Sequence, residues 1–75
     1  MSDLYPTPTR LALLDEVCLG IIERYGDHWL DRCGYRVDAR VGEAIDAGWV
    51  WADVDSVVLT EAGEAVLAQH RRADR

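Results

Sequence analysis

The sequence contains no lysine, only two serines and no apolar run close to the length of a membrane span. A transmembrane helix needs about 20 consecutive apolar residues, so we expect no membrane partner. The first residues lack the charged, apolar and small-residue order of a signal peptide, which predicts a cytoplasmic protein. Neither Ser2 nor Ser56 has a general base or a glycine elbow beside it, so we expect that the protein is not an enzyme.

Cysteine and histidine are also scarce. The four residues are Cys18, His28, Cys33 and His70. None of the gaps between them resembles the Cys-x-x-Cys or His-x3-His spacing of a zinc site, so neither a metal nor a cofactor is expected. Two cysteines in a chain without a secretion signal are typically reduced, and we predict that both are buried.

The composition is that of a small folded domain with an acidic balance. The chain has 75 residues, of which 49% are hydrophobic, too many for a disordered protein. A domain of this size removes only about 60% of its unfolded surface from water, so its core is modest. We expect an N-terminal arm at 1–7, one domain at 8–70 and an arginine-rich tail at 71–75. All eight basic residues are arginine and the formal net charge is −6, which disfavours contact with phosphate groups.

The clearest structural signal begins with a helix near the middle of the chain. Apolar residues recur there at spacings of three and four, which predicts one buried stripe. They are Val37, Val41, Ala44 and Ile45. Gly48 follows this pattern and predicts that the helix ends at Ala47, because glycine tolerates the left-handed conformation common at a helix C-terminus.

A hairpin and a further helix are predicted next. Residues 49–51 and 56–59 are rich in β-favouring side chains, and the polar segment 52–55 separates them, which indicates an antiparallel hairpin. Thr60 is a good N-cap for the helix that follows, and Glu61 suits the positive end of its dipole.

The tryptophans of the hairpin support two arrangements. In a strand, Trp49 and Trp51 lie on one face and Val50 on the other. We expect the two tryptophans in the core. The reverse arrangement leaves an exposed aromatic pair, which is typical of a protein contact or a dimer seam.

The N-terminal part predicts a helix that begins at Thr7 and Pro8, an N-cap followed by proline in the first turn. The apolar residues after it form two lines on different sides of this helix. The first line is Leu11, Leu14, Cys18, Ile21, Ile22 and Tyr25, and the second is Leu13 and Val17. The second line is covered either by the chain itself, as in the central helix of a small bundle, or by a second copy, which makes Leu13 and Val17 a candidate dimer interface.

The stretch between the two helices remains open. Residues 21–25 continue the first helix or form a strand, because Gly20 interrupts the helical pattern. Residues 26–34 hold a short helix from Asp27 to Arg32, N-capped by Asp27, or form a loop.

Two segments resemble the winged-helix family. They read Val-x-x-Arg-Val-x-x-x-Ile-x-x-Gly-Trp-Val at 37–50 and Leu-Thr-Glu-Ala-Gly-Glu-Ala-Val-Leu at 59–67. This order is similar to the recognition helix, wing and following helix of MarR-like regulators and of small winged-helix proteins of actinobacteria and their phages. The resemblance implies an α+β fold of about three helices with a small antiparallel β-hairpin wing.

The resemblance also implies where DNA would be contacted. In such proteins the outward side of the recognition helix lies in the major groove, and the wing touches phosphates. The candidate positions are Arg36, Ala39, Arg40, Glu43 and Asp46 on the helix, Ala52 to Ser56 in the wing, and Arg71, Arg72 and Arg75 in the tail.

Two functions follow. The first is a DNA-binding module for transcription regulation, of phage or actinobacterial type and dimeric, with double-stranded DNA as its partner. The alternative is an acidic protein-interaction module, such as an antirepressor, inhibitor or adaptor, that uses a winged-helix scaffold without DNA. We predict the first. A contiguous positive stripe through Arg32, Arg36, Arg40 and the tail favours DNA, whereas arginines dispersed among carboxylates favour a protein partner.

Overall fold

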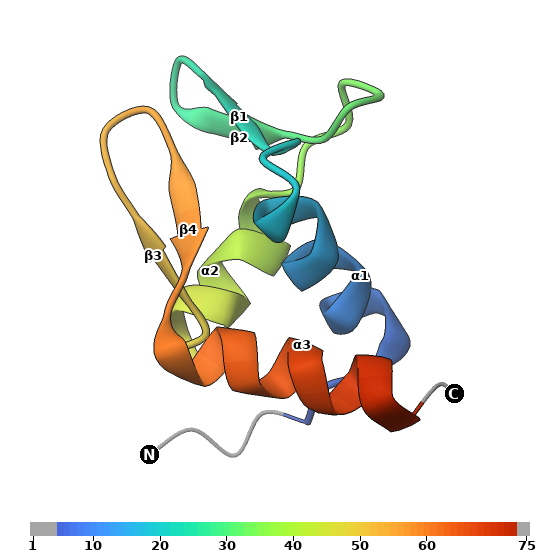
Figure 1. Cartoon of the computed structure of the whole chain (residues 1–75). Coiled ribbons are helices and arrows are strands. Elements are labelled where there is room, and N and C mark those ends of the chain that lie inside the picture. Colours follow the sequence, from blue (N-terminus) through green and yellow to red (C-terminus); the bar gives the residue numbers. More distant parts are fainter. Residues whose placement is uncertain (1–4, 74–75) are drawn as a thin grey trace.

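A computed structural model describes residues 5–73 of the chain. These residues form a small α+β domain of three helices and two antiparallel hairpins (Figure 1). In chain order the elements are α1 Pro8–Cys18, β1 Glu23–Tyr25, β2 His28–Leu30, α2 Asp38–Asp46, β3 Val50–Ala52, β4 Val57–Leu59 and α3 Glu61–Ala73. The predicted α+β class is confirmed, and a second hairpin lies between α1 and α2.

The helix α1 forms the centre of the core. Thr7 caps it through a hydrogen bond from the Arg10 N–H to Thr7 Oγ1 at 3.4 Å, and Pro8 lies in the first turn, as predicted. Its buried side chains are Leu11, Leu13, Leu14 and Val17. Because α1 packs against α2, α3 and β4, the chain itself covers these four side chains, which come from both apolar lines. The first line is not covered throughout, since Tyr25 lies beyond α1 and is 61% exposed.

This packing corrects two predictions about α1. Leu13 is 2% exposed and Val17 is 5% exposed, so neither side chain is available to a second copy and the candidate dimer interface is wrong. The reason is that α1 has neighbours on two sides, as in the alternative of a central helix. Cys18 and Cys33 are both free and exposed rather than buried, because Cys18 ends α1 and Cys33 lies in a turn.

The hairpin of β1 and β2 settles the stretch that the sequence left open. Glu23 pairs with Leu30 and Tyr25 with His28, so the strand alternative is confirmed for 23–25. For residues 26–34 the helix alternative from Asp27 to Arg32 is wrong, and the loop alternative misses the strand β2 at His28–Leu30. Gly26 has φ of +60° and forms a tight turn with Asp27, a conformation that glycine adopts easily, and the chain returns as a strand.

The helix α2 ends as predicted. Ala47 is its C-cap and Gly48 has φ of +78°. The Gly48 N–H donates to the Ile45 carbonyl at 3.0 Å, and the Trp49 N–H donates to the Ala44 carbonyl at 2.9 Å, the pair of bonds that defines a Schellman motif. The predicted stripe is buried at three of its four positions, whereas Ile45 is 42% exposed at the edge of the stripe.

The hairpin of β3 and β4 has one buried and one exposed face. Val50 and Val57 point into the core, while Trp51 and Val58, which are paired in register, point outward. Trp49 is buried, but it belongs to the C-terminal turn of α2 and not to the strand. The prediction that both tryptophans lie in the core is therefore wrong for Trp51, because the alternation of the strand starts only at Val50.

The last helix, α3, is capped by Thr60 as predicted. The Gly63 N–H donates to Thr60 Oγ1 at 3.1 Å, and the Thr60 hydroxyl donates to the Gly48 carbonyl. The helix continues to Ala73, so the predicted boundary after residue 70 falls inside it. Arg71 and Arg72 are helical, and Arg75 lies outside the described residues.

Candidate functional site

The outward side of α2 carries the residues that the winged-helix resemblance selects. Arg36, Ala39, Arg40 and Asp46 are exposed, as expected, and Glu43 is partly buried. The four positions within α2 share one side of the helix by their spacing, and α1 and β2 both contact α2. The prediction that Arg36 lies on the helix is wrong, because α2 begins at Asp38 and Arg36 forms an isolated bridge with Leu30. What they can bind depends on how many of their charges are already compensated by the chain itself.

Three arginines are paired with carboxylates of the same chain. Arg10 donates to Glu43 Oε2 from Nη2 at 2.8 Å and from Nε at 3.1 Å, which ties α1 to α2. The other two pairs are Arg36 Nε to Asp38 Oδ2 at 2.9 Å and Arg71 Nη2 to Asp15 Oδ1 at 2.6 Å. Surface pairs of this kind add little to stability because solvent screens them, but they neutralise the local charge.

These ion pairs bear on the choice between a contiguous positive stripe and arginines dispersed among carboxylates. The tail arginine Arg71 is bound to α1, Glu43 is bound by Arg10, and Arg36 is bound to Asp38. Arg36 and Arg71 are thus paired with carboxylates, whereas Arg32 and Arg72 make no ion pair within residues 5–73. Arg40 is the α2 arginine that makes no ion pair with any other residue in this described part of the chain.

Asp38 organises the contact between β2 and the start of α2. Its Oδ1 accepts a hydrogen bond from the Trp29 N–H at 2.7 Å, and its Oδ2 accepts one from Arg36 Nε at 2.9 Å. His28 Nδ1 is 3.4 Å from the same Oδ2. The Trp29 N–H, followed by Arg36, holds the pKa of Asp38 below its ordinary value of 3.8 because both stabilise the charged carboxylate.

This lowered pKa predicts a pH-dependent contribution to stability. A carboxyl group whose pKa is lower in the folded state stabilises the fold above its unfolded pKa, and this contribution is lost as the pH falls through the folded pKa. The wild type should therefore melt at a higher temperature than Asp38→Asn at neutral pH, and the gap should shrink as the pH falls below about 3.8. Thermal melts followed by circular dichroism measure it. Parallel curves for the two proteins would contradict this role, and His28→Gln, which removes only the longest contact, should behave nearly as wild type.

The outer face of the β3–β4 hairpin carries exposed apolar side chains. We call Trp51, Val54 and Val58 the hairpin face; they are 55%, 73% and 46% exposed. Trp51 and Val58 lie opposite each other on the two strands, and Val54 lies in the turn between them. Two carboxylates, Asp53 and Asp55, flank Val54 and are exposed.

Arg24 connects this hairpin to the other one, a contact for which the sequence gives no signal. Its Nη1 donates to the Val54 carbonyl at 3.2 Å, and its Nε donates to the Gly26 carbonyl at 2.9 Å. The guanidinium also lies 5.6 Å from the centre of the Trp29 ring. The two hairpins project from the helices side by side (Figure 1), and Arg24 joins the turn of one to the strand of the other.

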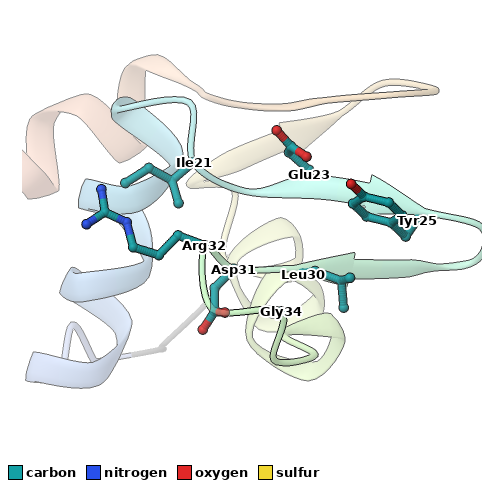
Figure 2. A pocket seen from close by; sticks show the side chains of 7 residues that line it. All are labelled: Ile21, Glu23, Tyr25, Leu30, Asp31, Arg32 and Gly34. Atoms are coloured by element: carbon teal, nitrogen blue, oxygen red, sulfur yellow. The ribbon is translucent and has the colours of Figure 1, made fainter.

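A cleft of about 480 Å³ lies on the other side of the β1–β2 hairpin (Figure 2). It is lined by Ile21, Glu23, Tyr25, Leu30, Asp31, Arg32 and Gly34. Its Asp31 Oδ1 accepts hydrogen bonds from the Cys33 N–H at 2.9 Å and the Tyr35 N–H at 3.0 Å, so this oxygen shapes the turn. Figure 2 shows Arg32 reaching toward Ile21 and away from Tyr25, and the lining offers no nucleophile paired with a base.

No family model, no curated protein and no solved structure matches this chain. Across residues 5–73, no helix is both long and apolar enough to cross a membrane. In the same range no group of three His, Cys, Asp or Glu side chains is placed to hold a metal ion. The candidate binding surfaces are the outward side of α2 and the hairpin face.

Proposed function

We propose that the chain is an acidic protein-interaction module on a winged-helix-like scaffold, and that it contacts its partner through the hairpin face. The observation that carries the proposal is the position of Trp51, which is 55% exposed on the strand whose Val50 fills the core. Tryptophan is enriched among the residues that contribute most to protein interfaces, because a large rigid ring gains contact area at little entropic cost.

The ion pairs support a protein partner over DNA. Affinity for DNA depends largely on cationic side chains that neutralise phosphates and release counterions. Here Arg36 already pairs with Asp38, Arg71 pairs with Asp15, and the hairpin turn carries Asp53 and Asp55. The formal net charge of −6 adds a long-range repulsion of a polyanion.

The winged-helix part of the proposal rests on the order of elements from α2 onward. A helix that ends at a glycine, a two-stranded hairpin and a capped helix follow one another, as in a recognition helix, a wing and the next helix. The β1–β2 hairpin stands directly before α2, where a helix-turn-helix motif has its first helix. We infer a divergent winged helix, in which the usual support of the recognition helix is replaced.

Photocrosslinking tests the protein contact. A benzophenone side chain in place of Val58, on the hairpin face, is expected to form discrete crosslinks to protein when the chain is irradiated in a lysate of its own cells. An added Trp51→Ser substitution should reduce the yield at least about tenfold, the loss expected for an interface anchor. Tyr35→Ser is the matched control, because Tyr35 is 71% exposed in the turn before α2. Equal yields from both variants would contradict the proposal.

One observation favours a second function, the reading of DNA by α2. Arg40 is exposed on the outward side of the helix and has no ion pair within residues 5–73, and Arg36 precedes it by four positions. Arginine is the side chain best suited to guanine and to phosphate oxygens. A dimeric transcription regulator of this kind would bind duplex DNA with an affinity that falls as salt rises.

A further inference from the structure

We infer that the partner of the hairpin face is a basic protein segment, which places an arginine or lysine against Trp51 beside Asp53 and Asp55. This inference rests on the proposed function and specifies the chemistry of the partner. The apolar part of the surface comes from the outward pair Trp51 and Val58 and from Val54 at the turn.

The charges of the hairpin have one sign. Between residues 49 and 60 the charged side chains are Asp53 and Asp55, and both are exposed. The Val54 N–H donates to Asp53 Oδ1 at 2.8 Å, which holds this carboxylate at the turn. Neither carboxylate forms an ion pair with another residue of the described range. The hairpin therefore presents two carboxylates without an ion pair, two and four residues after the exposed Trp51.

Arg24, which is bonded to the hairpin turn, does not form a direct ion pair with either carboxylate. Its guanidinium donates to the carbonyls of Val54 and Gly26 and lies over the Trp29 ring. Those contacts fix Arg24 behind the turn and leave Asp53 and Asp55 for another cation. A cationic side chain of a partner is attracted both by the carboxylates and by the face of Trp51, since tryptophan is the strongest aromatic acceptor of a cation.

The same charges argue against a second copy of this chain as the partner that binds the hairpin face. In a symmetric dimer formed through this face, each copy presents the same patch to the other. The carboxylates of Asp53 and Asp55 from both copies would then lie in one interface to which the hairpin supplies no arginine, and each chain carries a formal net charge of −6. Like charges brought together in an interface oppose binding, whereas a basic segment is complementary.

Peptide titration tests this inference. The probe is a capped nonapeptide of alternating arginine and valine, and its control carries glutamate in place of arginine. The arginine peptide should shift the indole N–H resonance of Trp51 in nuclear magnetic resonance spectra, with an affinity that falls as salt rises. The double substitution Asp53→Asn/Asp55→Asn should weaken binding roughly three- to tenfold. Glu16→Gln/Asp27→Asn changes the net charge equally and should leave the affinity close to that of wild type.

The outcomes separate the inference from the proposed function. Equal shifts with both peptides, no shift with either, or equal losses in the two double variants would overturn the basic partner. If the crosslinks at position 58 still depend on Trp51 in that case, the protein-interaction proposal stands and only the chemistry of the partner is wrong. A Trp51-dependent dimer in sedimentation equilibrium would identify a second copy as the occupant and would also overturn the inference.

Discussion

Replacing Gly63 by alanine is expected to destabilise the domain by about 3 kcal/mol, enough to unfold much of a small marginal domain. A Cβ atom at this position would lie 1.9 Å from the Trp49 carbonyl oxygen and 2.8 Å from its carbonyl carbon. Both are backbone atoms of the turn between α2 and β3, so they cannot rotate away as the end of a side chain would. To make room, α3 must move from the hairpin that it supports.

Gly42→Ala is the matched control for this substitution. Gly42 lies inside α2, and a Cβ there meets no atom within 4 Å. Alanine should therefore stabilise the helix by about 0.5–1 kcal/mol, because glycine loses more backbone entropy on folding. Thermal and urea melts followed by circular dichroism measure both variants. If Gly63→Ala melts within about 4 °C of wild type, equivalent to at most about 1 kcal/mol, the close packing of α3 on Trp49 is contradicted.

Leu13→Ala is expected to lower the free energy of unfolding by about 2–5 kcal/mol, the range for truncating a buried leucine. Leu13 is 2% exposed, although the sequence places it off the main apolar stripe of α1. Because it is covered by the chain itself, the loss should not depend on protein concentration. Urea melts at two protein concentrations measure this, with Leu19→Ala as the control, since Leu19 is 64% exposed and follows α1.

A different result would restore the dimer interface. If the melting temperature of the wild type rises with protein concentration and Leu13→Ala removes that dependence, Leu13 lies between two copies. The packing of Leu13 and Val17 within one chain would then not be their only contact, because a second copy would also cover α1. Unchanged stability in Leu13→Ala would equally contradict a core position.

The parts of the fold that sequence predicts are those fixed by neighbouring residues. Thr60 caps α3 through an N–H three residues away, and Gly48 ends α2 through bonds within its own turn. Such contacts require only the right residue at a short, fixed spacing. The hairpin of β3 and β4 is predicted for the same reason, because its strands are separated by a short turn.

The remaining parts depend on residues distant in sequence. Arg10 and Glu43 are 33 positions apart, so no spacing rule indicates that they pair. The same holds for Arg24 and the Val54 carbonyl, which are 30 positions apart. The prediction for Trp51 is wrong for a different reason. The alternation of a strand predicts which residues share a face, but the residue at which the strand starts depends on where the preceding helix turn ends.

In the candidate site, too, some features follow from neighbouring residues and others from residues distant in sequence. The outward side of α2 follows from the helical period, which predicts that Arg40 is exposed, whereas Arg36 is exposed but precedes the helix. Whether these arginines are free is a property of the tertiary structure, since Arg36 holds Asp38 and Arg10 takes up Glu43. The ion pairs therefore favour a protein partner over DNA, which the sequence alone does not indicate.

The most direct measurement is a titration of the purified chain with duplex DNA fragments at low and moderate salt, beside the Arg36→Ala/Arg40→Ala double variant. A protein-interaction module whose arginines hold its own carboxylates is predicted to show no salt-dependent binding even at low salt, with the two proteins indistinguishable. Binding that weakens steeply as salt rises and disappears in the double variant would contradict this account and assign α2 to the DNA groove.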